Sequence, residues 1–122
     1  MINADVLRKA IVAHSGWKTR LQAALNTGKC DVASATAKVD NQCDFGKWLY
    51  GPDISAVDKQ TEFYRTVKQL HAQFHQEAAK VIEWTTSGNT KAAEQSMALG
   101  GSYLKASSQL VEAITKWRDS LR

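Results

Sequence analysis

Chemical reactivity in this sequence is concentrated in three histidines and one cysteine. His71 and His75 are four positions apart, so on a helix both imidazole rings lie on the same face, one turn from each other. Two imidazoles at this spacing can bind one metal ion. His71 and His75 belong to one apolar stripe, and His14 lies in the middle of another. Cys43 lies in a short segment rich in aromatic residues. All three histidines therefore fall on faces that otherwise carry apolar side chains.

One thiolate together with three imidazoles is a set of ligands that suits zinc. Zn²⁺ has a filled d shell and accepts mixed sulfur and nitrogen ligands in a tetrahedron. Four protein ligands leave no coordination position for a reactive water, so such a site would be structural or regulatory rather than hydrolytic. We therefore expect a zinc-binding protein that is not an enzyme, in which each chain binds one ion through His14, Cys43, His71 and His75.

Each of these residues also has an interpretation without a metal. A single histidine on an apolar stripe is more often a hydrogen-bonded core residue, and a single cysteine is more often a small buried apolar residue. A metal-free dimerisation bundle therefore stays open. A di-iron enzyme or oxygen carrier would need inward carboxylates and more histidines, whereas most carboxylates of this chain lie off the apolar stripes.

Cys43 belongs to a stretch, residues 40–52, that has the features of a short helix with a signal at each end. Asp40 can cap the N-terminus by accepting backbone N–H groups. Gly51 can adopt the left-handed conformation that ends a helix, and Pro52 prevents continuation. Cys43 would then lie in the first turn, where unpaired N–H groups and the helix dipole stabilise a thiolate. The large apolar side chains of this stretch require the helix to dock on other elements.

The first histidine belongs to a long helix at the start of the chain. Apolar residues recur at three- and four-residue steps around His14, which predicts an amphipathic helix. Asn3 can cap this helix, and residues 26–28 end it. Residues 29–41 have no clear period and predict an irregular connection. Cys30 lies at its start, and we assign it no role.

Two further long helices are predicted after the short one. Ser55 and Asp58 resemble a capping box at the start of a helix that continues to about residue 84 and carries the second and third histidines. Asn89 can cap a last helix that continues to the C-terminus. Residues 100–101 are both glycine and reduce the stability of that helix by about 1 kcal/mol each.

These elements predict an all-α fold, an antiparallel four-helix bundle with three long helices and one short helix that carries Cys43. A chain of 122 residues has the length of one domain, and no change in composition divides it. We therefore expect a single zinc-binding helical domain over residues 1–122.

The composition excludes several classes of protein. No apolar run approaches the ~18 residues of a membrane span, and the N-terminus lacks the apolar core of a signal peptide. We therefore expect a cytoplasmic protein with no membrane contact. The net charge of +4 is spread along the chain, which argues against nucleic-acid binding. Cytosolic cysteines are more often thiols or ligands than disulfides, although a Cys30–Cys43 bridge stays open.

Three motifs occur along the chain in a characteristic order. They are His-Ser-Gly-Trp-Lys at 14–18, Cys-Asp-Phe-Gly-Lys-Trp-Leu-Tyr-Gly at 43–51 and His-Ala-Gln-Phe-His at 71–75. Together they resemble the chemoreceptor zinc-binding (CZB) domain family, from about residue 5 to residue 85. The resemblance implies a cytosolic helical bundle that forms symmetric homodimers and binds zinc through His14, Cys43, His71 and His75.

The resemblance also implies a regulatory role. Members of the family are modules attached to chemoreceptors or diguanylate cyclases, where zinc or thiol oxidants set the output. We expect a zinc-responsive sensor that modulates signalling through a partner or an attached output module. With the same site, Cys43 could instead sense oxidants, because oxidation of a zinc-bound thiolate releases the ion. The 122 residues contain no output module, so the domain either acts through a separate partner or is a piece of a larger protein.

Overall fold

The computed structural model describes residues 4–29, 37–39 and 43–121. Every regular element in this part of the chain is helical, and none is a strand. The elements are, in order, α1 (Ala4–Thr27), α3 (Asp44–Tyr50), the 3₁₀ helix η1 (Asp58–Gln60), α4 (Glu62–Thr86), α5 (Thr90–Met97) and α6 (Ser102–Ser120). None of these helices is long and apolar enough to cross a membrane.

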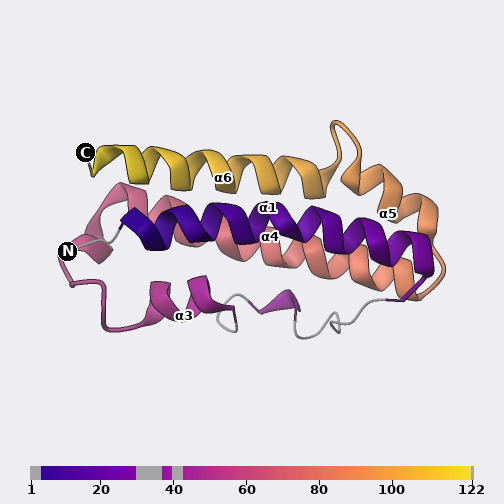
Figure 1. Ribbon diagram of the computed structural model, residues 1–122, viewed down its shortest axis with the longest axis horizontal. Coiled ribbons are helices and arrows are strands. Elements are labelled where there is room, and N and C mark those ends of the chain that lie inside the picture. Colours follow the sequence, from indigo (N-terminus) through magenta and orange to yellow (C-terminus); the bar gives the residue numbers. More distant parts are fainter. Residues whose placement is uncertain (1–3, 30–36, 40–42, 122) are drawn as a thin grey trace.

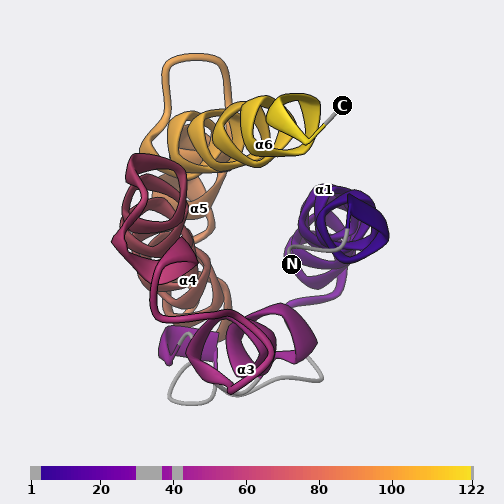
Figure 2. The same cartoon turned by 90° about the vertical axis from the view of Figure 1, so that its left-hand side faces the viewer.

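The helices form an antiparallel bundle. Figure 1 shows α1 and α4 running in one direction, while α3 and α6 run in the opposite direction. In the perpendicular view of Figure 2, α6, α4, α3 and α1 surround a common centre. The prediction of an all-α bundle with a short helix next to Cys43 is confirmed.

The core of the bundle holds the histidines together with the largest apolar side chains. Leu7, Leu21, Phe74 and Leu110 are completely buried, and His71 is buried among them. Burial of each large apolar side chain contributes about 1.5–3 kcal/mol. The three candidate imidazoles are therefore part of the core, whereas Cys43 is half-buried and packs against it.

The first helix agrees with its sequence signals. Its buried residues recur at three- and four-residue steps: Leu7, Ala10, His14, Leu21 and Ala24. Gly28 ends the helix with a φ of 75°, and its N–H donates to the carbonyl of Ala24 at 2.7 Å. The proposed cap, Asn3, lies outside the described residues.

The short helix begins and ends differently from the prediction. It starts at Asp44 and is capped by Cys43, whereas Asp40 lies outside the described residues. The prediction of a left-handed backbone at Gly51 is wrong, because this glycine has an extended backbone with a φ of −85°. A glycine fits at this position because the backbone of Lys47 lies close to it. A Cβ atom at this position would lie 2.8 Å from the carbonyl oxygen of Lys47.

The helix that carries two of the histidines starts later than predicted. Ser55 accepts the N–H of Asp58 at 3.1 Å, but Asp58 begins the short η1 turn rather than α4. Thr61 then adopts an extended backbone and caps α4 by accepting the N–H of Tyr64 at 3.3 Å. Two capping signals within seven residues explain the error.

The prediction of one uninterrupted last helix is also wrong. The chain breaks between α5 and α6, where Gly100 has a φ of 83°. A Cβ atom at Gly101 would clash with the carbonyl oxygen of Ser96. The Ser96 hydroxyl accepts the N–H of Tyr103 at 3.1 Å and so satisfies a donor in the first turn of α6. The cap of α5 is confirmed, since Asn89 accepts the N–H of Ala92.

Candidate metal centre

Three separate elements bring the four candidate ligands together. His14 comes from the middle of α1, Cys43 from the N-cap of α3, and His71 and His75 from α4. One ligand atom from each residue lies within 4.8 Å of the other three. The imidazoles are at most 2% exposed. The structure thus gathers all four residues that the sequence singled out, while their binding of zinc stays a prediction.

The spacing of the donor atoms agrees with a tetrahedral zinc site. Cys43 Sγ lies 3.4 Å from His71 Nε2 and 3.6 Å from His75 Nε2, and the two nitrogens are 3.0 Å apart. Zinc–ligand bonds of about 2.0–2.3 Å at tetrahedral angles require about 3.3 Å between two nitrogens and about 3.6 Å between sulfur and nitrogen. The donor types and their separations therefore fit zinc.

Backbone carbonyls orient two of the imidazoles. His14 Nδ1 donates to the carbonyl of Ala10 at 2.7 Å, and His75 Nδ1 donates to the carbonyl of Ala37 at 3.0 Å. With the proton on Nδ1, each ring keeps a lone pair on Nε2 for a metal. Such outer partners fix the tautomer and orientation of ligating histidines. Sequence analysis missed both hydrogen bonds. The one to Ala10 could have been predicted, because Ala10 lies one helical turn before His14. The one to Ala37 has no sequence signal.

The remaining imidazole does not behave as a satisfied core histidine. His71 Nε2 faces the sulfur of Cys43 and Nε2 of His75. Its Nδ1 is buried and has no hydrogen-bond partner among the described residues. A metal-free core histidine would be expected to pair its ring nitrogens with hydrogen-bonding groups. Here Nε2 of His71 instead faces a sulfur and a second imidazole nitrogen, and a cation shared between these three atoms would offset the repulsion between their lone pairs. This arrangement of Nε2, rather than the unpaired Nδ1, favours the metal interpretation over the metal-free one.

Burial keeps the imidazoles in the form that binds metals. Desolvation lowers the pKa of His14 to about 4, against the opposing effect of its hydrogen bond to Ala10 and together with repulsion from His75. Desolvation, with repulsion from the other two histidines, lowers the pKa of His71 to about 2. Both rings are therefore neutral at pH 7, with a lone pair for a cation.

Aromatic rings enclose the cluster. The ring of Phe45 meets those of His14 and His71 edge to face, with centroids 5.5 and 5.1 Å apart. The ring of Phe74 meets those of His14 and His75 at 5.1 and 5.6 Å. These contacts restrict the imidazoles and lower the local dielectric, which strengthens electrostatic interactions between donors and a bound cation.

A comparison with protein families supports the same site. The family model of the chemoreceptor zinc-binding domain matches residues 14–82. This range begins at His14 and includes Cys43, His71 and His75. The chain belongs to the chemoreceptor zinc-binding domain family. No curated protein and no solved structure matches the chain. The resemblance inferred from the three motifs is confirmed.

The candidate metal centre of this CZB chain borders a groove on one side. A groove of about 460 Å³ between α1 and α3 is lined by His14 and Cys43, and also by Trp17 and Trp48. Cys43 is half-buried, whereas the imidazoles are buried. Solutes can therefore reach the cluster most directly on its sulfur side.

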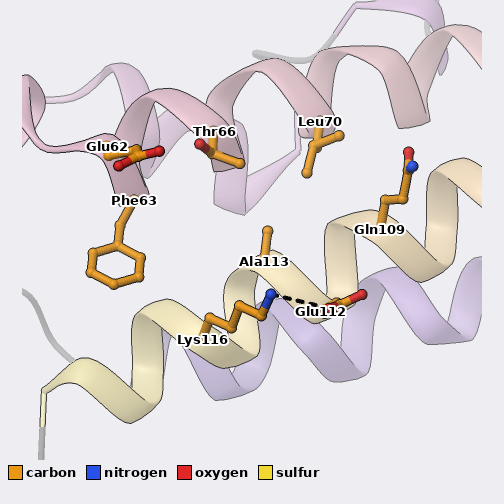
Figure 3. Close-up of a pocket in the computed structure, with 8 residues that line it drawn as sticks. All are labelled: Glu62, Phe63, Thr66, Leu70, Gln109, Glu112, Ala113 and Lys116. Carbon is orange, nitrogen blue, oxygen red and sulfur yellow. Dashed lines mark ion pairs between the residues drawn. The ribbon is translucent and has the colours of Figure 1, made fainter.

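A second groove of this CZB chain is unrelated to the metal centre. It has a volume of about 510 Å³ and lies between α4 and α6. Figure 3 shows Phe63 and Leu70 on α4 facing Ala113 on α6, next to the ion pair between Glu112 and Lys116. None of the four candidate ligands lines this groove.

Proposed function

We propose that this domain binds one Zn²⁺ per chain through His14, Cys43, His71 and His75, and that occupancy of this site regulates signalling. The observation that carries the proposal is the convergence of four donor atoms within 4.8 Å from three separate elements. When bound, zinc would supply a cross-link and a positive charge in the core rather than a reactive water, because the protein would fill its coordination shell.

Regulation follows from the origin of the ligands. α1 brings one imidazole, α4 brings two, and the N-cap of α3 brings the sulfur of the ligand set. A ligand set assembled from distant parts of a chain couples metal binding to folding and packing. We propose that the domain is a non-catalytic sensor in the cytoplasm that acts as a homodimer on a chemoreceptor or diguanylate cyclase, either as part of the same protein or as a separate partner. Membership of the chemoreceptor zinc-binding family supports this assignment.

Elemental analysis combined with native mass measurement tests the proposal. The expected result is about one zinc per chain, removable by a strong chelator, in a particle of twice the chain mass. Cys43→Ala and His71→Ala should lose zinc, while Cys30→Ser, a matched cysteine control, should keep it. A zinc content below about half an equivalent that neither ligand substitution changes would exclude the site.

A second candidate function, oxidant sensing at the same site, is favoured by the position of the sulfur. Cys43 lines the open groove between α1 and α3, and its Sγ accepts the N–H of Gly46 at 3.3 Å, which stabilises a thiolate. Peroxide would transfer one oxygen atom to this thiolate, giving a sulfenate and water. The oxidised sulfur is a weaker ligand, so the ion would be released.

Peroxide titration with a zinc-sensitive dye separates oxidant sensing from metal sensing alone. Zinc release should follow sulfenate formation at Cys43 and should be unchanged in Cys30→Ser. If Cys43 stays reduced while the methionines are oxidised, the oxidant-sensing function is wrong and the metal-sensing function is unaffected.

A further inference from the structure

The short helix α3 extends from the metal centre to one end of the bundle. Its N-cap is Cys43. At its other end, the hydroxyl of Tyr64 donates to the carbonyl of Leu49 at 2.8 Å, a buried hydrogen bond. The ammonium group of Lys59 donates to the carbonyl of Gly51 at 3.1 Å. Figure 1 shows that α4 begins and α6 ends at this side of the molecule.

A continuous series of ring contacts follows α3 from the imidazoles to α6. The ring of His71 meets Phe45 at 5.1 Å between centroids. Phe45 stacks on Trp48, with centroids 5.7 Å apart and an angle of 22° between the planes. Trp48 packs on Trp117 of α6 at 5.8 Å, and Tyr64 meets the same indole at 6.3 Å. Trp117, the last buried residue of α6, is thus in contact with α3, the helix that Cys43 caps.

A bound ion would fix the position of this series. A helix of seven residues has no stability of its own in water, so external contacts hold α3 in place. Cys43 Sγ caps the helix through Gly46 and faces the imidazoles of α4. Coordination of that sulfur would tie the N-terminus of α3 to α1 and α4. Its release would leave α3 held by the packing of Phe45 and Trp48 and by the hydrogen bonds at its C-terminal end.

The two ends of α6 depend on different supports. The first turn is held by the Ser96 hydroxyl and by contact between Tyr103 and Phe74, whose centroids are 5.6 Å apart. In the last turns, Trp117 is the final buried side chain, and Leu121 beyond it is 40% exposed. A change at Trp48 should therefore affect the last turns of α6 and leave its first turns unchanged.

We propose that α3 transmits zinc occupancy from Cys43 to the C-terminal turns of α6 through Phe45, Trp48 and Trp117, so that this end of the bundle is where the metal state is read. The inference rests on the proposed function, since it needs an ion at the site. It adds that α3 transmits the change in zinc occupancy and that the C-terminal turns of α6 respond to it.

Hydrogen exchange of the whole chain, with zinc and with a chelator, tests the proposal. In the wild-type protein, zinc should slow exchange of residues 44–50 and 114–120 by about fivefold or more, a typical size of coupling between sites. Residues 102–109 should change little. Trp48→Leu should bind zinc with the same stoichiometry and keep the effect on residues 44–50, but lose the effect on residues 114–120.

Two controls make each outcome decisive. Trp84→Leu removes another half-buried tryptophan of the bundle, near the far end of α4, and should keep the full response. Zinc binding without any response at residues 114–120 of the wild-type protein overturns the inference by itself, even if Trp48→Leu does not fold. A response that survives in Trp48→Leu overturns the ring pathway. Failure to bind zinc would instead refute the proposed function.

Discussion

At the scale of single residues, the sulfur of Cys43 combines two structural tasks. It caps α3 by accepting the N–H of Gly46, and it lies within 3.6 Å of the Nε2 atoms of His71 and His75. Helix caps are usually oxygen atoms of Ser, Thr, Asp or Asn. A zinc site would explain the use of a cysteine at this position, because sulfur can serve both tasks while a hydroxyl is a poor zinc ligand.

Substitutions of Cys43 should separate the two tasks. Cys43→Ser keeps a capping oxygen and Cys43→Ala removes it, so both should lose zinc, but the alanine variant should be less stable by about 1 kcal/mol. The measurement is urea unfolding of both variants in the presence of a chelator. Equal unfolding free energies would show that the cap contributes nothing.

Acid should destabilise the metal-free protein in a defined window. Desolvation lowers the pKa of His14 to about 4 and of His71 to about 2, whereas both titrate near 6.5 when unfolded. Below pH 6.5 the unfolded state binds more protons, so the free energy of unfolding should fall as pH decreases, by up to about 1.4 kcal/mol per pH unit for each histidine. His14 contributes down to about pH 4.

Urea unfolding of chelator-treated protein between pH 7 and 4.5 measures this dependence. The variant His14→Gln should show a shallower slope than the wild type, because one titrating group is absent. A stability that does not change over this range would mean that the imidazoles are not desolvated as the structure indicates.

At the scale of elements, the glycines of the chain have opposite roles. Gly100 has a φ of 83° in the α5–α6 turn, where an L side chain is strained. Gly16 is exposed in the interior of α1, and an added Cβ atom would meet nothing within 4 Å. We expect Gly100→Ala to destabilise the protein by about 1 kcal/mol and Gly16→Ala to stabilise it by about 0.5–1 kcal/mol.

Thermal or urea unfolding of the two variants checks these signs. Gly101→Ala should be more damaging than Gly100→Ala, since its Cβ atom would meet the backbone of Ser96. If Gly100→Ala were as stable as the wild type, α5 and α6 would form the continuous helix that the sequence predicts.

The errors of sequence analysis at this scale have local causes. Small residues around Gly100 fit a tightly packed straight helix as well as a turn, so hydrophobic periodicity did not reveal the break. Ser55 and Thr61 are both good capping residues, and the structure uses the second for α4. At Gly51, sequence cannot distinguish a positive φ from a close approach, because both require glycine.

At the scale of the whole molecule, zinc should determine much of the stability. A ligand that binds only the folded state stabilises it by about 2.7 kcal/mol at a free concentration of 100 times Kd, which corresponds to a shift of about 10 °C in melting temperature for a domain of this size. Calorimetry with and without a chelator measures the shift. Equal melting temperatures would favour the metal-free dimerisation bundle.

The fold class and the convergence of the candidate ligands were predictable because both depend on helical periodicity. His71 and His75 share a face by spacing alone, and His14 lies on an apolar stripe that must turn inward. The contacts that refine the site were not predictable. The carbonyl of Ala37 and the packing of Trp48 on Trp117 depend on how distant segments meet, which no local pattern encodes.

The unequal lengths of the ligand-bearing helices also bear on kinetics. Three candidate donors belong to helices of more than twenty residues, and the fourth caps a helix of seven, so we expect the sulfur to be the donor that detaches first. We expect the dissociation rate of the ion to follow the opening of α3, whereas its affinity depends on all four donors. Stopped-flow measurements on Tyr64→Phe, which loses the hydrogen bond to Leu49, should therefore show faster metal exchange with little change in equilibrium binding.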